Sequence, residues 1–167
     1  MSRELGDVYK RQADTAEVAG LLHDAAKQLP LPDMQALAEK SFPVLSAPIL
    51  ANGGLLHGYA AVTIAKERYG ITDAALLEAI AHHTTGAEQM STLEKIIFLA
   101  DYIEVNRDFD GVDDLRQAAR SDLDQAVLLG YDSTIRHLLD QGKPIFVGTV
   151  VNRNAQIDVV RAADRKA

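Results

Sequence analysis

The heptapeptide LLHDAAK at residues 21–27 places an imidazole, His23, beside a carboxylate, Asp24, inside an otherwise apolar run of small and aliphatic residues. Burying a carboxylate without a partner is costly, so the pair needs a compensating group. A cation held jointly by both side chains is the simplest such group. The pattern therefore predicts that further ligands for this cation lie elsewhere in the chain.

The composition is typical of a globular protein and restricts the classes of partner. The chain has 167 residues, enough for one domain with a hydrophobic core, and 47% of them are hydrophobic. No membrane partner is expected, because no window reaches the roughly 18 apolar residues of a membrane span. The absence of cysteine excludes disulfides and thiolate metal sites, and with no signal-peptide pattern it favours a cytoplasmic location. The net charge of −7 argues against a nucleic-acid partner but leaves a small phosphate ester possible if metal ions supply positive charge.

Helical patterns dominate the chain, and strand patterns are nearly absent. Asp14 and Glu17 are spaced as a capping box, and Pro30 would end the helix that they begin. Ser91 and Glu94 repeat the capping pattern. We therefore predict an all-α fold, with helices over residues 15–29, 34–40, 57–69, 93–104, 113–120, 123–141 and 149–161 and another capped by Asp73.

The domain boundaries follow from the same patterns. Residues 1–12 show no apolar periodicity, and we expect them to be disordered. Residues 13–167 carry no linker-like composition and no internal repeat, which predicts a single domain.

Further polar residues lie on predicted buried helix faces. His57 opens one apolar stripe, His83 shares the face of another, and Asp101 follows a third by one turn. Each of these alone is more often a satisfied core or capping residue. Together with His23 and Asp24 they form a nitrogen-and-oxygen donor set, which suits iron, manganese, cobalt or zinc.

The ordered series of these residues resembles the HD-domain metal phosphohydrolases, an all-helical superfamily. The flanking sequences narrow the resemblance to bacterial symmetrical diadenosine tetraphosphate hydrolases of the YqeK type. It covers roughly residues 13–154, and the helical bundle of that superfamily is the fold it implies. The sequences that carry the resemblance are GLLHDAAK (20–27), LHG (56–58), HTTG (83–86), LADYIE (99–104), RDF (107–109), GV (111–112) and KPI (143–145).

The resemblance implies hydrolysis of diadenosine tetraphosphate to two ADP by water activated on a metal centre that often contains iron, as one or two ions. A small-molecule nucleotide is the partner implied, and a homodimer is left open. The metal-site residues implied are His23, Asp24, His57, His83 and Asp101, with Asp24 as the bridge if two ions bind. Asp24 and Lys27 would be catalytic, and the substrate-binding residues implied are Lys27, Thr84, Thr85, Arg107, Phe146 and Thr149.

Each phosphate-binding residue also has a structural interpretation. Lys27 and Arg107 would hold phosphate oxygens, and the loop over residues 144–149 would contact a nucleoside. Alternatively, Lys27 extends its ammonium group to solvent at a helix end, and Arg107 pairs with Asp108 or Asp110.

The chain departs from the family pattern in two places. The family has a further histidine ligand upstream of the HD pair, whereas no histidine precedes His23 here. We expect residues 1–12 to be unrelated sequence in place of a native N-terminal helix, with poor iron binding and slow turnover as the result. The second departure is Val105, Asp110, Phe146 and Val147, which stand where the family usually has proline, proline, histidine and proline.

Two other functions remain open at this point. One is another HD enzyme that acts on a nucleotide monophosphate or a cyclic nucleotide. The other is a helical module that binds a nucleotide or a metal without turnover, and the missing histidine makes it more credible.

Overall fold

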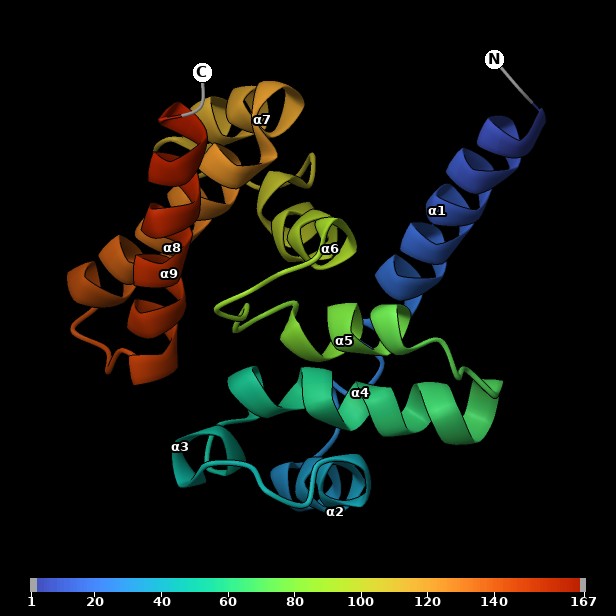
Figure 1. The fold of residues 1–167 in the computed structure, drawn as a ribbon. Coiled ribbons are helices and arrows are strands. Elements are labelled where there is room, and N and C mark those ends of the chain that lie inside the picture. The colour runs from blue at the N-terminus through green and yellow to red at the C-terminus, as the bar shows by residue number, and fades with distance from the viewer. Residues whose placement is uncertain (1–2, 166–167) are drawn as a thin grey trace. The chain divides into compact units, whose positions relative to one another are not determined.

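The computed structural model describes residues 3–165, which form helices joined by turns and loops, without a strand (Figure 1). The chain divides into two compact units, Met1–Thr84 and Thr85–Ala167. The single domain predicted over residues 13–167 stays a prediction. None of the described helices is long and apolar enough to cross a membrane.

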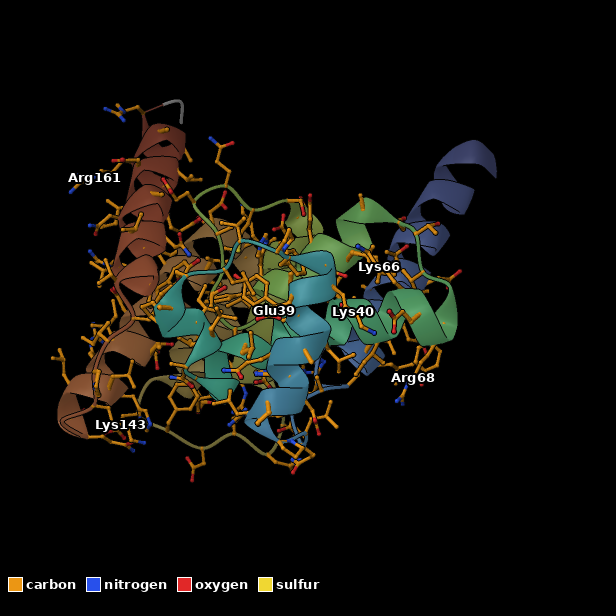
Figure 2. The ribbon with its side chains drawn as sticks, turned by 90° about the horizontal axis from the view of Figure 1, so that it is seen from below. Glu39, Lys40, Lys66, Arg68, Lys143 and Arg161 are labelled. Carbon is orange, nitrogen blue, oxygen red and sulfur yellow. The ribbon has the colours of Figure 1, made fainter. Side chains whose placement is uncertain are left out.

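The first unit is built around α4 (Gly53–Tyr69), which packs against α2 (Leu31–Ser41), α3 (Ala47–Leu50) and α5 (Ala74–His82). Small side chains let the neighbouring helices approach α4 closely, and an unbroken run of ten α4 residues from Leu56 to Ala65 is buried. At its outer end, Glu67 of α4 forms an ion pair of 3.0 Å with Lys40 of α2, whose position Figure 2 shows. The apolar run of α4 therefore forms the core of this unit.

The helix before the HD pair differs from its predicted bounds. Helix α1 spans Arg3–Leu22 and contacts α5, so residues 3–12 are helical where disorder was predicted. Residues 1–2 lie outside the described part of the chain. Asp14 and Glu17 lie in the interior of α1, so the prediction that they begin a helix is wrong. A capping-box spacing can also occur by chance within a helix. After Leu22 the chain continues as tight turns up to Pro30, with amide-to-carbonyl bonds such as Lys27 to Asp24 at 3.0 Å.

Most other predicted helix ends are close to those observed. Asp73 caps α5, Ser91 and Glu94 form a capping box on α6 (Thr92–Ile103), and Gly70 ends α4 in the left-handed conformation at φ 65°. Helix α4 begins four residues before its predicted start, because the Asn52 side chain accepts the Gly54 amide and caps it.

The second unit is a helical assembly around α8 (Leu123–Asp140), which packs against α6, α7 (Val112–Ser121) and α9 (Val147–Asp164). Its core contains Phe98, Leu99, Leu115, Val127 and Tyr131. Helix α9 begins at Val147, so Thr149 is a buried residue of its first turn and not part of a loop. The predicted nucleoside loop over residues 144–149 is therefore shorter than expected.

Candidate metal centre

Two of the predicted ligands lie immediately after helix ends in the first unit. Helix α1 ends at Leu22, directly before His23, and α5 ends at His82, directly before His83. The last carbonyl groups of a helix lack amide partners and carry partial negative charge, which favours a cation nearby. His57 lies one turn into α4, where it is buried.

Backbone carbonyl groups fix the orientation of all three imidazoles. A carbonyl oxygen only accepts hydrogen bonds, so each Nδ1 atom that lies against one must carry the hydrogen. In the neutral ring this leaves a lone pair on Nε2, the arrangement found in metal-binding histidines. The three Nδ1 atoms donate to Gly20 O at 2.6 Å from His23, to Gly53 O at 3.1 Å from His57 and to Ile80 O at 2.8 Å from His83.

The three imidazoles converge on the carboxylate of Asp24. The Nε2 atoms of His57 and His83 lie 2.9 Å apart, and they lie 3.1 Å and 3.6 Å from Asp24 Oδ1. His23 Nε2 lies 3.5 Å from Asp24 Oδ2. Ligand atoms of His23, Asp24 and His83 all lie within 4.8 Å of one another. Lone pairs that face one another at these distances repel unless a proton or a cation lies between them.

The donor set fits a metal ion. Asp24 Oδ1 is buried and accepts no hydrogen bond from any residue that the structure describes. A buried carboxylate oxygen of this kind is costly without a cation. Imidazole nitrogen and carboxylate oxygen, with no thiolate in the chain, suit a first-row transition metal.

The protonation states also suit metal binding. Burial lowers the pKa of His83 to about 4, so its ring is neutral near pH 7. Burial on its own would raise the pKa of Asp24, but the hydrogen bond from Lys27 and the neighbouring His23 and His57 outweigh it and lower this pKa. Asp24 is therefore a carboxylate at neutral pH, and His83 presents a lone pair.

Lys27 and Thr84 lie beside this cluster. Lys27 Nζ donates to Asp24 Oδ2 at 2.8 Å, and its side chain is 43% exposed. Lys27 therefore forms an ion pair with the HD aspartate, and it does not simply extend into solvent. The Thr84 hydroxyl lies 3.0 Å from His83 Nε2 and 3.5 Å from His57 Nε2.

The remaining predicted site residues belong to the second unit. Arg107 pairs with Asp101 at 3.2 Å and donates from Nε to the Asp101 carbonyl at 2.8 Å, so its partner is neither Asp108 nor Asp110. The Thr85 hydroxyl donates to Gly86 O at 3.1 Å. Phe146 occupies the N-cap position of α9, without a side-chain capping hydrogen bond, three residues before Thr149. Roles for these residues in a metal or substrate site stay predictions.

Comparison with known proteins identifies the family. Residues 1–106 match the HD domain family. The chain belongs to the HD-domain family. The match includes residues 1–12, whereas the resemblance read from the sequence began near Ala13. The predicted all-α HD fold is confirmed.

Similar HD-domain relatives share most of the chain. A protein of Halalkalibacterium halodurans named "Bis(5'-nucleosyl)-tetraphosphatase, symmetrical" is 40% identical, and the alignment covers 90% of this chain and 80% of the relative. A Bacillus subtilis protein of the same name is 36% identical over 90% and 81%. A crystal structure from Clostridium acetobutylicum, described as a "predicted HD superfamily hydrolase involved in NAD metabolism", has a TM-score of 0.83 at 42% identity and covers 93% of this chain and 82% of that one. The resemblance to symmetrical tetraphosphatases is confirmed.

Sequence reasoning missed the backbone groups that orient the HD-site histidines. The acceptors are carbonyls, which no residue type reveals. A signal was present in hindsight, because His23 and His83 each follow a helix end, where unpaired carbonyls three residues earlier are available. Gly58 belongs to the LHG sequence that carries the resemblance, but its packing role was not predicted: it lets α4 approach α5 beside His83.

Replacing Gly58 with alanine is expected to weaken metal binding by about 10- to 100-fold, the range typical for residues that orient metal ligands. A Cβ atom at this position would lie 2.9 Å from the carbonyl oxygens of Ile80 and Ala81 and 3.1 Å from His83 Cε1. Because Ile80 O orients the His83 ring, α5 and this ligand must shift together. The dissociation constant for Mn²⁺, measured in chelator-buffered titrations, checks this.

The matched control is Gly20→Ala in α1, where a Cβ atom meets nothing within 4 Å. The backbone carbonyl of residue 20 still accepts from His23, so metal affinity should stay at the wild-type value. Equal affinities for both variants would contradict the role given to Gly58.

Proposed function

We propose that this chain hydrolyses diadenosine tetraphosphate symmetrically, to two ADP, at the centre formed by His23, Asp24, His57 and His83. The observation that carries the proposal is the convergence of three imidazole Nε2 atoms on the Asp24 carboxylate, whose buried Oδ1 accepts no hydrogen bond from the described residues. Two relatives that align with 90% of this chain bear the name of that activity. Asp101 is proposed as a further ligand.

We propose iron as the metal, as one or two ions, with manganese, cobalt or zinc as alternatives that the same donors accept. When bound, such a metal lowers the pKa of a coordinated water towards about 7 and neutralises charge on phosphoryl oxygens. His23, Asp24 and His83 would hold it, and His57 Nε2 lies close by, 2.9 Å from His83 Nε2 and 3.1 Å from Asp24 Oδ1. The backbone carbonyls on Nδ1 keep each Nε2 lone pair directed inwards.

Lys27 is proposed as a phosphate-binding residue, which its position beside Asp24 and its exposure support. An ammonium group has three donors, and one of them is used by Asp24 Oδ2. The others are available for substrate because the side chain is 43% exposed. Lys27 would therefore stabilise negative charge that develops on the tetraphosphate while it also holds Asp24 in its ionised form. The departing ADP is a stable anion and needs little protonation.

The other substrate contacts follow the family resemblance. Arg107 would bind phosphate oxygens with the guanidinium nitrogens that Asp101 leaves free. The Thr84 hydroxyl, beside two of the imidazoles, would donate to a phosphoryl oxygen. The Thr85 hydroxyl would donate a hydrogen bond to the substrate in the same way. Phe146 and Thr149 would contact a nucleoside.

Metal removal and a nucleotide panel test the proposal. Chelation should abolish hydrolysis, and Fe²⁺ or Mn²⁺ should restore it. At 100 times its dissociation constant the metal should also stabilise the fold by about 2.7 kcal/mol, seen as a higher melting temperature. Diadenosine tetraphosphate should be the preferred substrate over AMP and cyclic nucleotides. Metal and nucleotide binding without turnover would instead support a binding module.

A further inference from the structure

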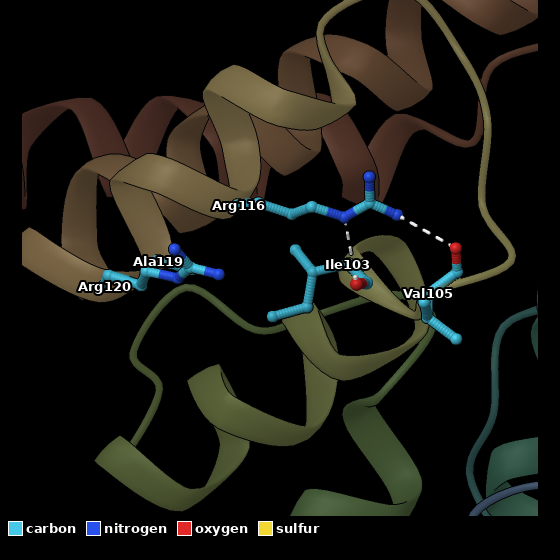
Figure 3. A pocket seen from close by; sticks show the side chains of 5 residues that line it. All are labelled: Ile103, Val105, Arg116, Ala119 and Arg120. Atoms are coloured by element: carbon cyan, nitrogen blue, oxygen red, sulfur yellow. Dashed lines mark hydrogen bonds between the residues drawn. The ribbon is translucent and has the colours of Figure 1, made fainter.

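Arg116 of α7 binds the backbone of the segment that follows α6. Its Nε donates to Ile103 O at 3.3 Å, and its Nη2 lies 3.5 Å from Val105 O (Figure 3). The same Nη2 lies 2.9 Å from Glu104 O and 3.0 Å from Arg107 O. Its Nη1 donates to Asp113 Oδ1 at 3.0 Å, one turn earlier on the same helix. One guanidinium thus serves four carbonyl groups within five residues of chain.

This segment needs such a donor because of the way α6 ends. The last carbonyls of the helix have no amide partner within it. At Glu104 the chain turns to φ −52° and ψ 142°, and no glycine is present to form a left-handed cap there. A cation at a helix C-terminus is also favoured by the helix dipole. The Arg116 guanidinium, on the neighbouring helix α7, therefore supplies hydrogen bonds to the carbonyl groups at the C-terminal end of α6.

The same segment carries Arg107, whose side chain folds back on the helix. Arg107 Nε donates to Asp101 O at 2.8 Å, and Nη2 pairs with Asp101 Oδ1 at 3.2 Å. Arg116 donates a hydrogen bond to the backbone carbonyl of Arg107, and the Arg107 side chain forms an ion pair with the carboxylate of Asp101. A chain of contacts therefore runs from α7 through the loop to Asp101.

We propose that Arg116 is a positioning residue, which orders residues 103–107 so that Arg107 is held on Asp101. The inference rests on the proposed function, in which Asp101 and Arg107 act on metal and phosphate. Arg116 itself binds carbonyl groups and is not a ligand for substrate. It acts through Arg107 by fixing the backbone from which that side chain extends.

Arg120 offers a matched control. It lies one turn further along α7 and lines the same pocket of about 460 Å³ as Ile103, Val105, Arg116 and Ala119 (Figure 3). The hydrogen bonds described for Arg116 at residues 103–107 do not involve Arg120. Replacing either arginine with glutamine removes the same charge from the same helix and pocket, but only the change at Arg116 removes bonds to the loop.

The first test is hydrogen exchange of a peptide that covers residues 101–108. Arg116→Gln should raise amide exchange there at least about 10-fold, because the loop loses its donors, whereas Arg120→Gln should leave exchange unchanged. Arg116→Lys, which keeps the charge but loses the planar fork, should fall between wild type and Arg116→Gln. Unchanged exchange in both Arg116 variants would overturn the proposal.

The second test is a double-mutant cycle with Arg107→Ala, read as kcat/KM for diadenosine tetraphosphate. Arg116→Gln alone should lower kcat/KM by about 10- to 100-fold. In the Arg107→Ala background the same change should lower kcat/KM by less than about 3-fold. Additive losses would overturn the proposal. A wild-type chain that fails to hydrolyse the substrate would contradict the proposed function instead, and the exchange comparison would still decide the role of Arg116.

Discussion

Asp24→Asn is expected to lower turnover of diadenosine tetraphosphate by at least about 1,000-fold, equivalent to about 4 kcal/mol of transition-state stabilisation. Asp24 is the carboxylate on which all three imidazoles converge, and Oδ1 lies 3.1 Å from His57 Nε2. Asparagine keeps the shape but removes the negative charge that a metal needs. Its amide can also donate a hydrogen bond to an imidazole lone pair, so the metal-free fold should remain intact.

Initial rates, metal content per chain and melting temperature together check this expectation. The melting temperature of the metal-free variant should stay near that of metal-free wild type, which would separate loss of the site from loss of the fold. Asp33→Asn, an exposed aspartate in the first turn of α2, is the control and should keep wild-type rate and metal content. Unchanged metal content in Asp24→Asn would place the metal elsewhere.

Gly86→Ala is expected to destabilise the fold by about 3 kcal/mol. Gly86 has φ 61°, and a Cβ atom there would lie 1.7 Å from the hydroxyl oxygen of Tyr131 and 2.7 Å from its Cζ. Tyr131 is 1% exposed and packed against Phe98, with ring centroids 4.8 Å apart, so it cannot move aside freely. Overpacking of about 1–3 kcal/mol adds to about 1–2 kcal/mol for an L-residue in the left-handed region.

Gly142→Ala separates these two contributions. Gly142 has nearly the same backbone angle, φ 62°, but a Cβ atom there meets nothing within 4 Å. Its loss in the free energy of unfolding should be only about 1 kcal/mol, from backbone strain alone. Urea unfolding of both variants measures the difference. Equal losses would show that the contact between Gly86 and Tyr131 is not a tight one.

Helical periodicity predicted much of the local fold because the elements are long or strongly capped. The capping box at Ser91 and Glu94 and the cap at Asp73 set their helices as predicted. The same pattern failed at Asp14 and Glu17, because spacing alone cannot distinguish a helix start from a helix interior. The prediction that His57 and His83 face inwards followed from apolar neighbours at helical spacing, and both are buried.

The chemistry around the candidate site was less predictable. The pairing of Arg107 with Asp101 depends on the conformation of the chain after α6, which Arg116 sets through carbonyl groups. Backbone acceptors carry no residue identity, so no sequence pattern marks them. The close approach at Gly58 depends on the packing of two helices and likewise becomes visible only in three dimensions.

The measurement that tests the central claim most directly is the identity of the nucleotides released from diadenosine tetraphosphate by the metal-loaded chain. The proposed function predicts ADP as the only product, two molecules for each substrate consumed, resolved by ion-exchange chromatography. Equal amounts of ATP and AMP would contradict it, because the cut would then fall at a different anhydride bond.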